Sequence, residues 1–119
     1  MQQACDKLAE LRDRYRRGVK LDDRHCTFNT EWLSTIELGF TLEVAEAMAH
    51  SALGRRESRG AHVRLDGFGD RDDANFLVHT LAHRRGDGPP AISHEPVHIT
   101  TSPPKTRHYG GAGVKAELT

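Results

Sequence analysis

The sequence predicts a mainly α-helical fold in which the helices come first and a β-hairpin and an extended C-terminal tail follow. Two helical stretches, separated at Gly18, carry this prediction, and the second is long and apolar on several sides. After Gly60 the residues become typical of loops, turns and short strands. We therefore divide the chain into a long-helix portion (1–62), a segment with a polar loop, a short helical turn and a β-hairpin (63–108), and a flexible tail (109–119).

The first predicted helix covers residues 2–17. Ala4, Leu8, Leu11 and Tyr15 recur at steps of four, three and four residues, so they share one narrow stripe of the helix. Gly18 then ends it, because glycine readily adopts the left-handed conformation that follows a helix.

The second predicted helix covers residues 30–57. Asn29 is a favourable N-cap, and Glu31 places a carboxylate in the first turn, where the helix dipole favours it. Arg55 and Arg56 lie near the other end, where the dipole favours cations.

This helix needs neighbours on more than one side, because its apolar residues lie on three different faces. The first helix supplies one neighbour only, so other chain must cover the rest. The three faces are formed by Trp32, Ile36 and Phe40; by Leu38, Leu42, Ala49 and Leu53; and by Val44 and Met48.

The remaining elements are short. Asp72 or Asp73 caps a helical turn at residues 75–77. Strands at 80–85 and 91–95 then flank a Gly-Asp-Gly turn, which predicts a β-hairpin.

The overall composition excludes several classes of protein. Seventeen basic residues balance seventeen acidic ones, so no nucleic-acid partner is expected. No run of 18 apolar residues occurs, which excludes direct membrane insertion. The first residues lack a secretory signal, and Cys5 and Cys26 have no Cys-x-x-Cys spacing. Reduced thiols in a cytoplasmic protein are therefore expected, with a Cys5–Cys26 disulfide as the alternative.

Residues with catalytic or metal-binding potential lack the patterns that such sites need. His79 and His83, like His94 and His98, have a spacing that suits a zinc pair on a helix, but both pairs fall in extended stretches. There is no nucleophile elbow and no dinucleotide-binding glycine motif. We expect no catalytic, cofactor-binding or metal-binding residue, and a histidine-dependent metal site is the alternative.

The densest polar segment is residues 55–64, RRESRGAHVR. It is either a solvated helix end or a docking site, where guanidinium groups meet carboxylates or carbonyls of another domain.

Residues 56–62 (RESRGAH) are similar to a signature of the fumarate reductase and succinate dehydrogenase flavoprotein subunits. Further segments resemble the same family in the same order along nearly the whole chain. They are residues 28–30, 37–39 and 45–52, which look most like the fumarate reductase branch, then DRDDANFLVHTL at 70–81, ITT at 99–101 and PPKTRHYGG at 103–111.

The resemblance implies an antiparallel, spectrin-repeat-like helical bundle without its first helix, packed on a flavin domain. It implies a parent enzyme that reduces fumarate to succinate with electrons from quinol, through FAD and an iron–sulfur subunit. The family's active-site and FAD-binding residues lie upstream of this region, so this chain alone is expected to bind no cofactor and to be inactive. Attachment at the inner face of the membrane would come only through partner subunits.

The partners implied are the flavin-binding domain of the same subunit and the iron–sulfur subunit. An L-aspartate oxidase fragment and a free-standing helical interaction module are the alternatives. The candidate residues for docking between domains are Arg56, Glu57, Ser58, Arg59, His62, Arg107 and Tyr109.

Overall fold

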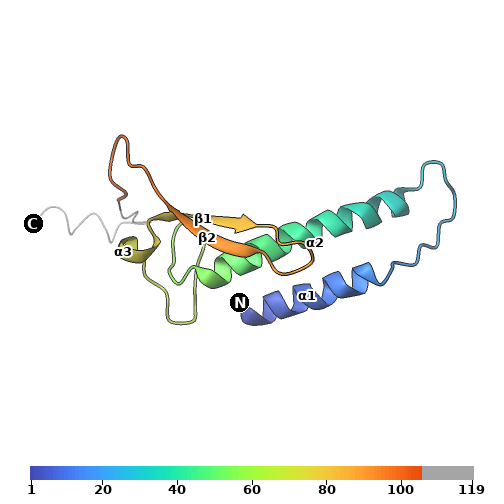
Figure 1. Cartoon of the computed structure of the whole chain (residues 1–119), viewed down its shortest axis with the longest axis horizontal. Coiled ribbons are helices and arrows are strands. Elements are labelled where there is room, and N and C mark those ends of the chain that lie inside the picture. Colours follow the sequence, from blue (N-terminus) through green and yellow to red (C-terminus); the bar gives the residue numbers. More distant parts are fainter. Residues whose placement is uncertain (106–119) are drawn as a thin grey trace, which may run out of the picture.

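The computed structural model, described here for residues 1–105, contains a helical pair followed by a small β-hairpin (Figure 1). This arrangement confirms the predicted mainly α fold with a hairpin after it. The elements in chain order are α1 (Gln2–Arg16), α2 (Thr30–Gly54), α3 (Asp73–Phe76), β1 (Val78–His83) and β2 (Ala91–Pro96).

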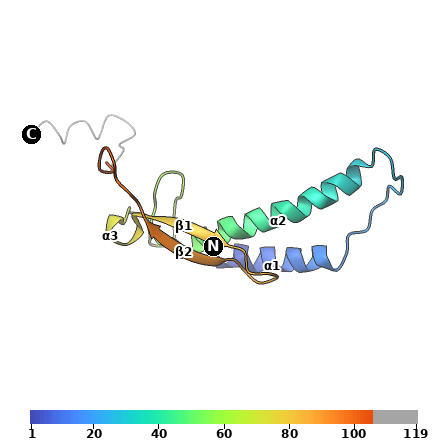
Figure 2. The same cartoon turned by 45° about the horizontal axis from the view of Figure 1, so that its top comes forward.

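The helices α1 and α2 lie side by side and run in opposite directions (Figures 1 and 2). Residues 17–29 form the connector that joins them at one end. Cys5 of α1 and Leu42 of α2 are the hydrophobic residues that the described part of the chain buries. Both cysteines are free, and burial raises the pKa of the Cys5 thiol. Tyr15 packs closely on α2, because a Cβ added at Gly39 would lie 2.6 Å from its hydroxyl.

The predicted stripe of α1 is wrong at Ala4, which is exposed. Arg12, which does not belong to that stripe, is turned toward α2. Arg12 can lie there because its Nη1 is 2.5 Å from Oε2 of Glu46, which is itself only 4% exposed. An ion pair that joins two helices therefore replaces apolar packing at this point.

The start of α2 is fixed by its side chains. Asn29 is the N-cap, as predicted, and its side chain accepts a hydrogen bond from Trp32 N at 2.8 Å. The carboxylate of Glu31 accepts bonds from the backbone of Asp22 and Asp23, which holds the connector against the helix. These bonds give acceptors to backbone N–H groups of the connector and of the first helical turn, which would otherwise have none within the chain.

The end of α2 differs from the prediction, because the helix stops at Gly54 and not at residue 57. Arg55 is extended, with φ −81° and ψ 101°. The cation at this helix end is the buried Arg64, whose Nη1 donates to the carbonyls of Ala52, Leu53 and Arg55 at 2.8, 3.3 and 3.0 Å. Arg64 thereby takes the place that the sequence assigned to Arg55 and Arg56.

The strands β1 and β2 form a two-stranded antiparallel sheet over the C-terminal half of α2 (Figures 1 and 2). The pairing of Thr80 with His94 sets the register. The loop after β1 reaches α1, where Arg16 pairs with Asp87 at 2.7 Å and Arg12 donates to the Gly88 carbonyl at 3.3 Å. The hairpin is thus attached to both helices.

The molecule is more extended than a compact domain of its size. Its Cα radius of gyration is 20.3 Å, against about 13 Å for a compact chain of this length. Large apolar side chains of α2 stay more than half exposed, namely Trp32, Leu33, Phe40, Val44 and Met48. None of the described helices combines the length and the apolar composition that crossing a bilayer requires.

Candidate docking site at the end of α2

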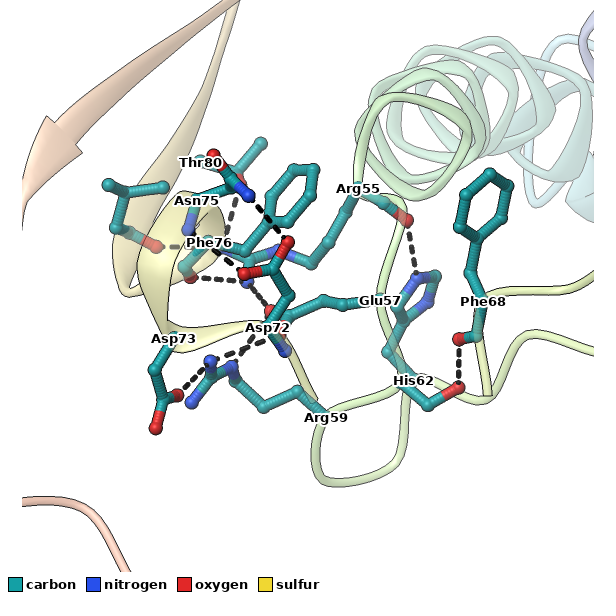
Figure 3. Close-up of polar contacts among 12 residues, drawn as sticks. Arg55, Glu57, Arg59, His62, Phe68, Asp72, Asp73, Asn75, Phe76 and Thr80 are labelled. Carbon is teal, nitrogen blue, oxygen red and sulfur yellow. Dashed lines mark hydrogen bonds and ion pairs between the residues drawn. The ribbon is translucent and has the colours of Figure 1, made fainter. Parts of the chain in front are cut away.

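The site is organised around Glu57, which is completely buried although it lies in a run of polar residues. Its Oε1 accepts hydrogen bonds from Arg55 Nη1 and Arg59 Nε, and its Oε2 from Arg59 Nη2 and the backbone N–H of Asp72 (Figure 3). The two guanidinium groups and the amide satisfy both oxygens, which makes burial of the charge tolerable.

The partners of Glu57 connect distant parts of the chain (Figure 3). Arg55 donates to the carbonyls of Phe76 and Val78 at 2.9 and 2.7 Å, so it links the end of α2 to α3 and β1. Arg59 reaches Oδ1 of Asp73 at 2.6 Å. We call Arg55, Glu57, Arg59, Asp72 and Asp73 the Glu57 cluster.

The acidic segment before α3 supplies the other half of the Glu57 cluster. Asp72 is the N-cap of α3, since its side chain accepts from Asn75 N at 3.1 Å. It is one of the two caps that the sequence left open, and the other, Asp73, is the first residue of the helix. Asp73 pairs with Arg71 at 2.8 Å as well as with Arg59. The RESRG and DRDD motifs, which are separate in sequence, therefore form one network.

The network shifts the pKa values of its carboxyl groups. Burial acts to raise the pKa of Glu57, but hydrogen bonds from Arg59, the Asp72 amide and Arg55 outweigh it and hold the pKa below the usual 4.5. The hydrogen bond from Arg59 likewise lowers the pKa of Asp73, and bonds from Asn75 lower the pKa of Asp72. In the folded chain these groups keep their negative charge into more acidic solution than in the unfolded chain.

The stability of the chain is therefore expected to fall in acid. The unfolded carboxyl groups have pKa values of 4.5 (Glu) and 3.8 (Asp), and the folded ones lie lower. At a pH between the folded and the unfolded values, the unfolded chain therefore binds more protons than the folded chain. In this pH range the free energy of unfolding rises with pH. The contribution is complete above about pH 5 and is lost as the pH falls through the folded values. Urea midpoints measured from pH 7 to pH 3 test this, and a pH-independent midpoint contradicts it. A Glu57→Gln variant should show a shallower decline.

The remaining residues of the RESRGAH motif hold the local backbone. Arg59 and His62 exchange backbone hydrogen bonds at 2.9 and 3.0 Å around a tight turn, where Gly60 has the positive φ of 59° that glycine tolerates. The Ser58 hydroxyl donates to the Phe68 carbonyl and accepts from Arg64 N. His62 Nε2 lies 3.2 Å from the Arg55 carbonyl. Glu57, Ser58, Arg59 and His62 are thus engaged within this chain.

Arg64 is a structural residue at this site that sequence reasoning missed, and the bonds of Arg55 to α3 and β1 were missed as well. Besides capping α2, the Arg64 guanidinium binds both carboxylate oxygens of Asp66, at 2.8 and 2.6 Å. Its position nine residues after Arg55 gave no indication of a role at the helix end. The one available signal was a further arginine four residues after Gly60.

Replacement of Arg64 by lysine is expected to lower the melting temperature by several degrees. A lysine ammonium keeps the charge, but it cannot donate to the α2 carbonyls and to both carboxylate oxygens of Asp66 at the same time. Circular dichroism melts of the purified chain measure the effect. The matched control is Arg56→Lys, at an exposed position, which should melt like the parent chain. Equal melting of all three proteins would show that the cap is unimportant.

The other docking candidates have different outcomes. Arg56 is exposed and, among residues 1–105, makes no hydrogen bond or ion pair. Arg107 and Tyr109 lie outside the described residues, as does the predicted tail. Among the docking candidates within residues 1–105, Arg56 is therefore the one whose charge is available to another molecule.

Within residues 1–105 the histidines do not gather. His79 and His83 both lie on β1, so that pair is extended along a strand as expected, whereas His94 lies on β2 and His98 follows the end of that strand. His83 Nε2 is 2.7 Å from the hydroxyl of Ser93. Within the described residues, no three side chains that could bind a metal come together.

Comparison with known proteins identifies the family to which this chain belongs. The family described as fumarate reductase flavoprotein C-term matches residues 1–109. The chain is 55% identical to the fumarate reductase flavoprotein subunit of Escherichia coli over 118 residues, which are 98% of this chain and 19% of the relative. It is 46% identical over 107 residues to the Mycobacterium tuberculosis subunit, covering 90% of this chain and 18% of that one.

A solved structure agrees. A chain in a structure of a variant E. coli quinol fumarate reductase superposes with a TM-score of 0.83 at 56% identity, over 92% of this chain and 19% of that chain. These matches favour fumarate reductase over the L-aspartate oxidase alternative. The chain spans about one fifth of the length of these relatives. It belongs to the C-terminal family of fumarate reductase flavoprotein subunits.

Proposed function

We propose that this chain is the C-terminal structural and docking part of a fumarate reductase flavoprotein subunit, and that it is not catalytic by itself. In the whole subunit, the reaction would be the reduction of fumarate to succinate with electrons that come from quinol. FAD would bind to the part of the subunit that lies outside this chain. The family membership and the engagement of the RESRGAH residues within the chain support this assignment.

The observation that carries the proposal is the uncovered apolar face of α2. Phe40, Val44 and Met48 are 65%, 60% and 68% exposed. Residues four positions apart are only about 40° apart around a helix, so two of the three faces expected from the sequence adjoin and form one exposed surface. Soluble monomeric proteins rarely leave such a continuous apolar surface in water. We infer that the flavin-binding part of the same subunit covers this face.

The proposed partners follow from the same arrangement. The flavin-binding domain would pack on α2, and the iron–sulfur subunit would contact the assembled flavoprotein. Attachment at the inner, cytoplasmic face of the membrane would occur only through such partner subunits. The names of the solved relatives, which are quinol–fumarate reductases, support a multisubunit assembly.

A chimeric enzyme tests the proposal. The matching region of the E. coli flavoprotein subunit is exchanged for this chain, and fumarate reductase activity is measured in membranes of cells that lack their own subunit. We expect the chimera to assemble and to be active. Phe40→Asp combined with Met48→Asp should abolish assembly, because both charges would enter a buried interface.

The matched control is Gln3→Asp, which adds a carboxylate at an exposed position in the first turn of α1. It should leave activity unchanged. A chimera that fails to assemble, or one that tolerates the double substitution, would favour the free-standing interaction module. Fumarate reduction or FAD binding by the purified chain alone would also contradict the proposal.

A further inference from the structure

A hollow of about 810 Å³ opens where α2 ends, between the start of α1, the loop before α3 and strand β2. Its lining includes two aromatic rings, Phe68 and Phe76, and four side chains that can carry positive charge, namely His50, Arg56, Arg64 and His94. Among residues 1–105, no aspartate or glutamate lines it. In a chain with equal numbers of acidic and basic residues, this local imbalance marks the surface as complementary to an anion.

The aromatic walls are held in place by the groups described above. The Arg64 guanidinium lies 5.3 Å from the centre of the Phe68 ring, and the Arg55 guanidinium lies 5.7 Å from that of Phe76. The His94 ring meets Phe76 edge-on, with centroids 6.4 Å apart. Arg55 and Arg64 are themselves held by ion pairs with Glu57 and Asp66, so they keep the two phenylalanine rings in place. The hollow is therefore preformed.

The charge available in the hollow belongs to Arg56. Arg64 also lines it, but its guanidinium is occupied by Asp66 and the carbonyls of α2. Arg56 has no hydrogen bond or ion pair among residues 1–105, and the same holds for the rings of His50 and His94. A guanidinium beside apolar rings is suited to a carboxylate that is itself next to an apolar group.

We propose that the hollow receives an aspartate or glutamate side chain, flanked by an apolar residue, from the flavin-bearing part of the same subunit. Arg56 pairs with the carboxylate, and Phe68 and Phe76 contact the apolar neighbour. This inference rests on the proposed function. One exposed guanidinium binds a free carboxylate only weakly, whereas a segment joined covalently to this chain is present at high effective concentration. That difference favours the same subunit over a soluble anion.

Carbodiimide coupling in the chimeric enzyme tests the proposal directly. Arg56→Lys keeps the positive charge and supplies an amine, which the reagent joins to a carboxylate in contact with it as an amide. Mass spectrometry of the digested enzyme should show position 56 linked to an aspartate or glutamate of the flavin-bearing part. Arg14→Lys, at an exposed position of α1 with no hydrogen bond or ion pair in the described part of the chain, is the control and should give no such link.

Charge reversal supplies the second measurement. Arg56→Glu should lower the temperature of flavin release by a few degrees, and reversal of the mapped carboxylate to lysine should restore it. A link from position 56 to the iron–sulfur subunit or to this chain itself, or no link in an assembled and active chimera, overturns the inference but leaves the proposed function intact. A chimera that does not assemble overturns both.

Discussion

We expect Glu57→Gln to lower the free energy of unfolding of this chain by about 3 kcal/mol, because it removes the negative partner of a buried ion pair and leaves the arginines in place. Glutamine preserves the shape but has one acceptor oxygen and an NH₂ group in place of the second oxygen. Arg55 and Arg59 then compete for that acceptor, and one guanidinium faces another donor. The loss should also loosen α3, since the Asp72 amide bonds to the same carboxylate.

Urea unfolding at pH 7, followed by circular dichroism, measures the effect. The matched control is Asp87→Asn, which removes the charge of an ion pair whose aspartate side chain is 88% exposed. Exposed pairs of this kind contribute no more than about 1 kcal/mol. A Glu57→Gln variant as stable as the Asp87→Asn control would show that the Glu57 cluster does not hold the chain together.

The second large effect is expected at the contact between the two long helices. Arg12→Met should cost about 3 kcal/mol, because it leaves the carboxylate of Glu46 buried without its partner. The double variant Arg12→Met with Glu46→Leu removes both charges and fills the space with apolar atoms. It should recover to within about 1 kcal/mol of the parent chain, since apolar replacement of a buried pair is often neutral.

Comparison of the single and double variants separates the two roles of Arg12. If the double variant stays as unstable as the single one, the hydrogen bond from Arg12 to the Gly88 carbonyl is the important contact. The experiment uses the same urea titration, so the three unfolding curves are directly comparable. A single variant with parental stability would contradict the assignment of a buried pair.

The sequence identified the elements whose determinants are local, although α3 and β1 each begin two residues earlier than predicted. Asn29 and Asp72 cap helices that begin at the next residue, and the glycine-rich turn joins two strands of opposite direction. Such signals depend on bonds that span a few residues, so periodicity and capping preferences identify them.

Prediction failed where the determinants are distant. The end of α2 was placed three residues too late, because the group that binds its last carbonyls is Arg64, in a loop with no periodic pattern. Glu57 lies between Arg56 and Arg59, and a run of charged residues usually indicates an exposed surface. Its burial depends on donors up to 15 residues away, and nothing in the sequence shows that these donors meet. The family resemblance located the motif, but only the geometry gave each side chain its role.

The reach of each contact along the chain has a consequence for the order in which the molecule folds. The bonds of the Glu57 cluster join residues 2 to 25 positions apart, whereas the bonds from α1 to the hairpin loop span 71 and 76 positions. Closing a longer loop costs more chain entropy, so short-range contacts form sooner. The region from the end of α2 through the hairpin can therefore consolidate before the hairpin loop attaches to α1. The two long helices can pair before that attachment as well, because the Arg12–Glu46 contact spans only 34 positions. The bonds of Asp87 and Gly88 to α1 are then the last of these contacts to form.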